Sequence, residues 1–309
     1  MSQPIVRPLW QLHRADPEKL MQTYAARTRK RFDKWRRSGR AVPVIIPSRN
    51  EEHDIVACLV ALARSSRPVL PIVVVNCSDD RTFERAERMG AMVTEIKSGV
   101  RKMGATQRGI KLATEYFEST NTTRRVILFT DADTLVPRRW ASILSRRLRR
   151  ALDRDPLHGA AVFGSSVFLH GPSRLADFGQ SAHGFYLDIW QAIRRGTPLV
   201  RGHTYGLGLD LNDVIVKTLD RLDPETMYRD DVMIYDTLKR TGVPIFRCLN
   251  PKAVVVTRGD RAHSFKEFME NLYKPGYEGS TYDKQYTICP PAAKKTTRKF
   301  SRPVRPATK

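Results

Sequence analysis

The sequence is poor in cysteine and contains no long hydrophobic run. Its four cysteines, Cys58, Cys77, Cys248 and Cys289, are scattered and form no C-x-x-C pair. This scatter argues against a disulfide framework, so we expect free thiols and a cytoplasmic protein. No apolar run reaches membrane-spanning length, and residues 1–7 lack the apolar core of a signal peptide. At 309 residues and 41% hydrophobic content, the chain is long enough to bury its own core.

Acidic residues are also scarce. Lysine and arginine number 54 against 32 aspartates and glutamates, which gives a net charge of +22. An excess of this size indicates a polyanionic partner, which is a nucleic acid, an anionic membrane surface or an acidic polymer. A basic protein without such a partner is the alternative interpretation.

Residues 1–41 are expected to form a basic helical arm. Asp16-Pro17-Glu18 is a typical helix start, with a capping residue, a proline at the first position and an acid in the first turn. The candidate polyanion-binding residues on this helix are Arg29, Lys30, Arg31, Arg36 and Arg37. Either the helix packs on the core with a solvated basic face, or that face contacts phosphates or a membrane surface.

From residue 42 the chain alternates β-rich runs with helical patterns, which predicts an α/β fold with a mostly parallel sheet covered on both faces. Strands are expected at 42–47, 72–75, 92–96 and 126–130, and helices at 51–63, 81–89 and 104–116. The later, mixed pattern predicts helices at 140–152, 173–196 and 231–241 and strands at 160–169 and 253–256. Residues 42–135 and 136–290 are expected to be the two halves of the fold, and 291–309 a disordered basic tail.

Asp131-Ala132-Asp133 follows the apolar run 126–130 directly. Two carboxylates one residue apart at the end of a buried strand can point into the crevice where open α/β sheets bind ligands. Carboxylate oxygens suit hard divalent cations, and such a cation can bridge them to a diphosphate. The pattern therefore suggests that a nucleotide diphosphate is bound through a metal ion. The alternative interpretation is a solvent-exposed turn that binds no ligand.

Four segments in chain order resemble the GT-A-fold glycosyltransferases of family 2. They are strand 44–46 with P-S-R-N-E-E from Pro47, strand 72–75 with N-C-S-D-D-R-T from Asn76, the D-x-D at 131–133, and Arg229-Asp230-Asp231 opening a helix that ends K-R-T-G. The resemblance covers roughly 42–257. It implies a Rossmann-like nucleotide-sugar-binding sheet in 42–135, with helices on both faces, merged with a smaller mixed sheet on the acceptor side, in 136–290.

The resemblance also implies a nucleotide-sugar donor, most commonly a UDP-sugar. The implied donor-binding residues are Pro47, Ser48, Asn50, Glu52, Asn76, Asp79, Lys102, Gly104, Arg108, Asp131 and Asp133. Family members usually have an aspartate where this chain has Asn76, and an amide offers a donor as well as an acceptor. The nucleobase contact is therefore expected to differ from that of the family.

The implied cofactor is Mn²⁺ or Mg²⁺, held by Asp131 and Asp133. His263 is the candidate for a third ligand, although a lone histidine is more often structural. The carboxylate pair Asp230 and Asp231 matches the family's catalytic pair, of which Asp231 is the implied general base for transfer with inversion. An acid at a helix N-terminus is favourable on its own account, which is the alternative reading of this pair.

The acceptor is not decided by the fold. DNA carrying a hydroxymethylated base, as in phage enzymes that modify DNA in the host cytoplasm, accounts for the net charge and the basic arm. A lipid-linked or cell-envelope acceptor at an anionic membrane surface is the second candidate. A non-enzymatic nucleic-acid binder on the same fold is the third, and the intact Asp131, Asp133 and Asp231 argue against it.

Overall fold

The structure is a computed structural model. It describes residues 9, 11–12, 15–97, 102–122, 125–154, 159–164, 166–169, 208–210, 213–222, 234, 237–248 and 250–258. The predicted helix 173–196 and the tail 291–309 lie outside these residues, as do residues 231–233 and 235–236 of the predicted helix 231–241. No helix among the described residues combines the length and apolar character needed to cross a membrane.

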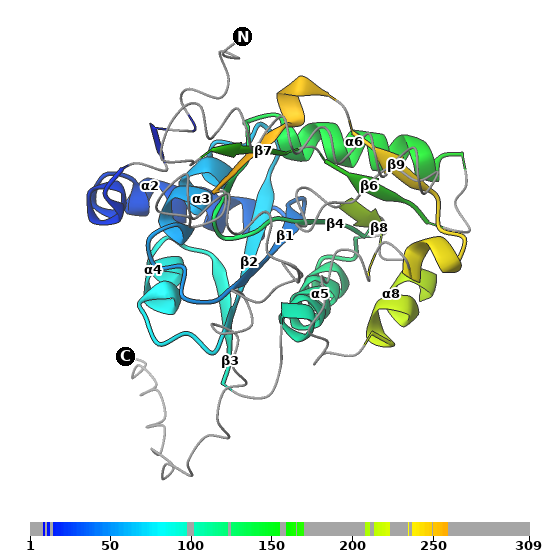
Figure 1. Cartoon of the computed structure of the whole chain (residues 1–309), viewed down its shortest axis with the longest axis horizontal. Helices are drawn as coiled ribbons and strands as arrows, with labels where there is room; N and C mark the ends of the chain where they lie inside the picture. The colour runs from blue at the N-terminus through cyan, green and yellow to red at the C-terminus, as the bar shows by residue number, and fades with distance from the viewer. Residues whose placement is uncertain are drawn as a thin grey trace, which may run out of the picture.

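A seven-stranded mixed sheet forms the centre of the fold (Figure 1). Its strands are β1 (Val42–Ser48), β2 (Val69–Asn76), β3 (Met92–Ile96), β4 (Val126–Phe129), β6 (Ala161–Phe163), β8 (Gly208–Asp210) and β9 (Ile245–Arg247), in the order β3-β2-β1-β4-β8-β6-β9. The strands β3, β2, β1 and β4 are parallel, whereas β8 is antiparallel to β4 and β6. The predicted α/β fold is confirmed.

Helices cover both faces of this sheet. The first layer contains α2 (Pro17–Arg37), α3 (Ile55–Ala63), α4 (Thr82–Arg88) and α6 (Trp140–Leu152), and the second contains α5 (Lys102–Ser119) and α8 (Asp213–Asp220). Successive side chains of a strand point to opposite faces. Val44 and Ile46 of β1 therefore pack against the first layer and Ile45 against the second, and all three are fully buried.

The helix α2 packs on the core instead of projecting as a separate arm. Its apolar stripe, including Leu20 and Phe32, is buried in the first layer. The Asp16 side chain accepts a hydrogen bond from the backbone N of Lys19 at 3.0 Å, and this bond lowers the pKa of Asp16. Gly90 has a φ of +88°, and a Cβ added there would lie 2.6 Å from the Cα of Arg29. Glycine at this turn thus allows α2 to pass directly over it.

Three of the predicted elements need correction. The predicted strand 160–169 is two strands, because β6 pairs in the main sheet while β7 (Ser166–Leu169) pairs with β10 (Val255–Arg258). Together with β5 (Thr134–Leu135), these two strands form a second sheet of order β5-β10-β7. The strand predicted at 253–256 begins only after the short 3₁₀ turn η1 (Pro251–Ala253). The helix predicted from residue 51 begins at Ile55, since Glu51–Asp54 form the loop described below.

The contact between α5 and β1 depends on Gly109. A Cβ added at Gly109 would lie 2.4 Å from Cγ2 of the fully buried Ile45, whose branched side chain has little freedom to move. We expect Gly109→Ala to lower the free energy of unfolding by about 1–3 kcal/mol through overpacking, measured by urea denaturation. The control is Lys111→Ala on the exposed side of the same helix, and equal midpoints for both variants would contradict the argument.

Candidate functional site

The strand order reverses between β1 and β4. The chain proceeds from β1 to β2 and β3 on one side and then returns to place β4 on the other side of β1. Ligands of open α/β sheets bind outside the carboxyl ends of the strands at such a reversal. The register aligns Ile45 with Phe129, so the loop after Ser48 and the loop containing Asp131 flank this point.

Asp131 and Asp133 occupy the loop after β4 beside the first turn of α5. Nζ of Lys102 lies 2.9 Å from Oδ1 of Asp131, which is largely buried. Asp133 is partly exposed, and its Oδ1 accepts a hydrogen bond from Oγ1 of Thr134 at 3.3 Å. The structure thus brings Lys102 together with Asp131 and its neighbour Asp133.

Negative charge is concentrated beneath this loop. The thiol of Cys58 lies 3.7 Å from the carbonyl oxygen of Asp131. Burial raises the pKa of the Cys58 thiol well above its usual range, and the carboxylates of Asp133, Asp131, Asp54 and Glu51 raise it further. The thiol is therefore neutral, and the carboxylates around it favour a cation at this point.

The donor atoms here fit a hard divalent cation in chemistry but make an incomplete ligand set. Asp131 and Asp133 supply carboxylate oxygens, and Asp131 already pairs with the ammonium of Lys102. Among the described residues, no cluster of three or more histidine, cysteine or acidic side chains could hold a metal ion. His263 lies outside the described residues. The buried Thr257 of β10 contacts this loop, because Oγ1 of Thr134 donates to its Oγ1 at 3.1 Å.

The loops after β1 and β2 are joined by hydrogen bonds. The backbone N of Asn50 donates to Oγ of Ser78 at 3.0 Å, and Oδ1 of Asn50 accepts from the backbone N of Asp79 at 3.1 Å. Asn50 and Cys77 both have positive φ values, of 52° and 49°. Such values are uncommon for residues other than glycine and often mark functional sites. The joined loops form a wall on one side of the strand-order reversal.

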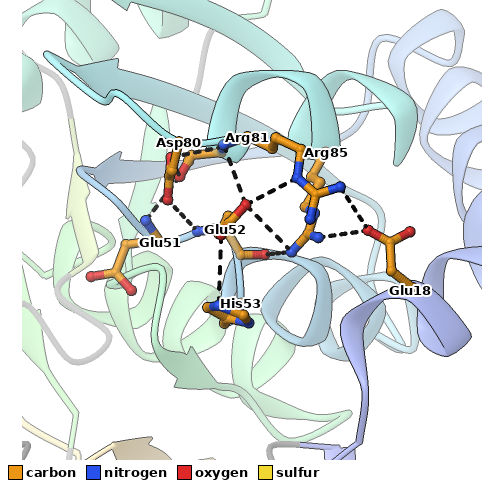
Figure 2. A network of polar contacts seen from close by, with 8 residues as sticks. Glu18, Glu51, Glu52, His53, Asp80, Arg81 and Arg85 are labelled. Carbon is orange, nitrogen blue, oxygen red and sulfur yellow. Dashed lines mark hydrogen bonds and ion pairs between the residues drawn. The ribbon is translucent and has the colours of Figure 1, made fainter.

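A network of charged side chains holds these two loops to α2 (Figure 2). Arg85 of α4 is only 2% exposed, and its guanidinium lies 2.6 Å from a carboxylate oxygen of Glu18 and donates to the Glu52 carbonyl at 2.6 Å. Arg81 contacts the same two glutamates, at 3.3 Å from Glu18 and 3.2 Å from Glu52. The Glu52 side chain bonded to Arg81 raises the pKa of Arg81. We call Glu18, Glu52, Arg81 and Arg85 the arginine brace.

The predicted donor-binding residues therefore differ in their surroundings. Pro47, Ser48 and Asn76 are buried at the ends of β1 and β2, and Gly104 is buried in the first turn of α5. Asn50 and Glu52 make structural contacts between loops, and Asp79 is exposed. Arg108 is exposed on α5 and, within the described chain, makes no hydrogen bond or ion pair to the other predicted site residues. The predicted catalytic residues Asp230 and Asp231 lie outside the described residues.

Sequence reasoning missed Arg85 and Glu18. A signal for Arg85 was present, because it lies three residues after Thr82 and four before Met89, and both of these are fully buried. A cation at helical spacing within a buried stripe requires a carboxylate partner. Its partner Glu18 was interpreted only as a favourable residue in the first helical turn.

Comparison with known proteins finds a family match that covers the strand-order reversal and the loops beside it. Residues 44–175 match the family described as "Glycosyl transferase family 2". The predicted resemblance to family 2 is confirmed, and the mixed α/β sheet, with its parallel strands β3, β2, β1 and β4, accords with the GT-A fold that the resemblance implied.

The chain is also similar to one curated protein over a shorter stretch. The chain is 36% identical over 104 residues to the 4,4'-diaponeurosporenoate glycosyltransferase of Staphylococcus haemolyticus (strain JCSC1435), a stretch covering 33% of this chain and 27% of that protein. The match thus spans about a quarter of the curated relative.

Solved structures of glucosyl-3-phosphoglycerate synthase from Mycobacterium tuberculosis are also similar to this chain. The complex with Mn²⁺, UDP-glucose and phosphoglyceric acid has a TM-score of 0.44 at 18% identity, covering 78% of this chain and 82% of that one. The complex with Mg²⁺ and UDP has a TM-score of 0.44 at 18% identity, covering 77% and 78%. Likeness at this level carries no argument about what this chain binds.

The arginine brace yields a test of stability. We expect Arg85→Met to lower the free energy of unfolding by about 3 kcal/mol, because it removes the buried partner of two carboxylates and leaves the Glu52 carbonyl without its donor. Arg81→Met removes an exposed cation from the same glutamates and should lower the free energy of unfolding by much less than Arg85→Met does. Urea denaturation of both variants measures the difference, and similar losses would show that burial of Arg85 does not matter.

Proposed function

We propose that this chain is a glycosyltransferase that moves a sugar from a nucleotide-sugar to an acceptor hydroxyl. The observation that carries the proposal is the placement of Asp131, Asp133 and Lys102 at the strand-order reversal, inside the region that matches family 2. Lys102 begins α5, whose N-terminal end adds a favourable field for an anion. The three residues together offer both a cation and cation-binding oxygens to a diphosphate.

The donor is proposed to lie along the joined loops. The nucleoside would occupy the wall formed by the loops after β1 and β2, where the buried Ser48 and Asn76 end their strands. A UDP-sugar is the proposed donor, with the amide of Asn76 in place of the family's usual aspartate. The arginine brace keeps Glu52 and the backbone of this wall in place before the donor binds.

Asp131 and Asp133 would hold Mn²⁺ or Mg²⁺, with His263 as a further proposed ligand. When bound, such a cation acts as a Lewis acid that offsets the charge on a departing diphosphate. Lys102 neutralises Asp131 in the absence of the donor and would turn its ammonium to a phosphate oxygen in the complex. Asp231 is the proposed base that removes the proton from the acceptor hydroxyl, with Asp230 beside it, in a direct displacement that inverts the anomeric centre.

The proposed acceptor is a hydroxymethylated base in DNA, in the cytoplasm. Its support is the net charge of +22 and the exposed cations of α2, which include Arg29, Lys30 and Arg37. Access to a base inside a duplex requires that the base be flipped out, and flipping depends on a firm grip on the phosphates. A lipid-linked or cell-envelope acceptor at a membrane surface is the competing candidate in the test.

The carboxylates are tested by substitution. Asp133→Ala and Asp231→Asn should each abolish transfer without lowering the urea midpoint, and EDTA should stop transfer by the natural chain. Mn²⁺ binding, followed by the electron paramagnetic resonance of free Mn²⁺, should weaken in Asp133→Ala and not in the control Asp220→Asn at the exposed end of α8. Full transfer in EDTA would remove the metal from the proposal, and an active Asp231→Asn enzyme would remove the base.

The function itself is tested by a transfer assay. The full chain, Mn²⁺ and a panel of nucleotide-sugars are mixed with hydroxymethylcytosine DNA, hydroxymethyluracil DNA or unmodified DNA, and the digested nucleosides are weighed by mass spectrometry. A hexose- or pentose-shifted nucleoside from modified DNA alone is the expected result. Slow donor hydrolysis without a shifted nucleoside would reject the DNA acceptor, and absence of both hydrolysis and transfer would reject the enzyme.

A further inference from the structure

Six arginines from three separate segments lie on one side of the molecule. They are Arg27 and Arg31 of α2, Arg64 and Arg67 in the turn between α3 and β2, Arg138 just before α6, and Arg149 within α6; we call them the arginine face. Two hydrogen bonds join the segments. The backbone N of Ser66 donates to the Arg138 carbonyl at 2.8 Å, and Nη2 of Arg31 donates to the Ser65 carbonyl at 3.4 Å.

The arginine face includes residues from outside α2, whereas the sequence predicted a basic surface formed by residues of α2. Arg31 and Arg36 are partly buried, and Arg36 donates to the Gly90 carbonyl at 3.2 Å. Arg29, Lys30 and Arg37 remain exposed on the helix. The structure adds to α2 four arginines that are distant in the sequence, so that the basic surface extends across the first helix layer.

The cations of the arginine face repel one another. Burial lowers the pKa of Arg31, and the nearby Arg27 and Arg138 lower it further. Burial likewise lowers the pKa of Arg67, with Arg149 as the second cause. Residues 55–78 and 134–152 contain no acidic residue. Among the ion pairs formed within the described parts of the chain, none includes an arginine of this face. Such an uncompensated cluster destabilises the fold, and a bound polyanion would relieve the repulsion.

The side chains are held ready for an anion. The guanidinium of Arg31 lies 4.7 Å from the ring centre of Trp35, and that of Arg64 lies 5.9 Å from the ring centre of Tyr24. Aromatic rings in this position restrict a guanidinium without occupying its hydrogen-bond donors. Nε of Arg67 has no hydrogen-bond partner among the described residues.

The arginine face is separate from the proposed donor site. The turn containing Arg64 and Arg67 precedes β2, whereas the donor site lies beyond its last residue, Asn76. An eight-residue strand is roughly 23 Å from end to end. A ligand on the arginine face is therefore not the diphosphate of the donor.

We propose that the arginine face binds the sugar-phosphate backbone of duplex DNA. Residues 55–78 and 134–152 supply arginine and no lysine, and guanidinium groups match phosphate oxygens in a two-pronged geometry that ammonium groups lack. An anionic membrane attracts lysine and arginine alike, so the absence of lysine from these two segments favours directed phosphate contacts. This binding does not depend on the transfer reaction, and the test below contains no donor sugar.

The test compares two double variants of the full chain that carry the same net charge. Arg64→Gln/Arg138→Gln removes two exposed cations of the arginine face, and Lys111→Gln/Arg240→Gln removes two exposed cations elsewhere. Binding to a fluorescent 20-base-pair duplex is measured by anisotropy over a range of salt concentrations. We expect the slope of log affinity against log salt to fall in magnitude by about 2 in the first variant and to stay unchanged in the control.

A third variant separates loss of charge from loss of structure. Arg64→Lys/Arg138→Lys keeps both charges and should retain the slope of the natural chain. Equal losses of slope in the two Gln variants would overturn the proposal, because net charge alone would then explain the binding. Unaltered DNA binding in Arg64→Gln/Arg138→Gln, with loss of its binding to phosphatidylserine vesicles, would overturn it in favour of a membrane surface.

Discussion

The burial of a single guanidinium fixes the positions of three segments at the carboxyl end of the sheet. Removal of a cation from water is so unfavourable that Arg85, at 2% exposure, requires oxygen partners in good geometry. Glu18 of α2 provides one and the carbonyl of Glu52 the other. The helix α2 and the loop after β1 are thus bound to α4 through one side chain. This contact also fixes the position of the wall that the loops after β1 and β2 form.

That wall contains backbone conformations that would not persist alone. Asn50 tolerates its positive φ because a short amide can bond locally. Cys77 has a similar φ of 49°, and its backbone N donates to the Ile96 carbonyl at 2.8 Å. The hydrogen bonds between Asn50 and Ser78 and between Asn50 and Asp79 hold the two loops against each other. The backbone N atoms of Glu51 and Glu52 extend this contact, because they donate to the side chains of Thr82 and Asp80. The strained backbone of Asn50 and Cys77 therefore lies in the loops at the carboxyl ends of β1 and β2. The arginine brace holds these loops in place.

The sequence was informative where local pattern and global fold agree. The strand 92–96 and the helix 140–152 were predicted to the residue, because each has its own periodicity and clear ends. The strand predicted at 160–169 failed, since the change of sheet after Phe163 depends on partners far along the chain. In the site, the D-x-D was recognisable from its position after a strand, whereas its ion pair with Lys102 was not predicted. Glu18 and Arg85 are 67 residues apart, and no local pattern connects them.

The two ends of the parallel strands differ in charge. The loops after β1, β2 and β4 carry the acids Glu51, Glu52, Asp54, Asp79, Asp80, Asp131 and Asp133, whereas the turn before β2 and its neighbours carry the arginine face. A polyanion is therefore repelled at the carboxyl end except where Lys102 and a bound cation neutralise the acids. A duplex bound at the proposed site on the arginine face would keep its backbone clear of these carboxylates. Because the two ends are separated by the length of a strand, DNA held there would not by itself have a base at the proposed donor site, and the base would have to enter from the acceptor half.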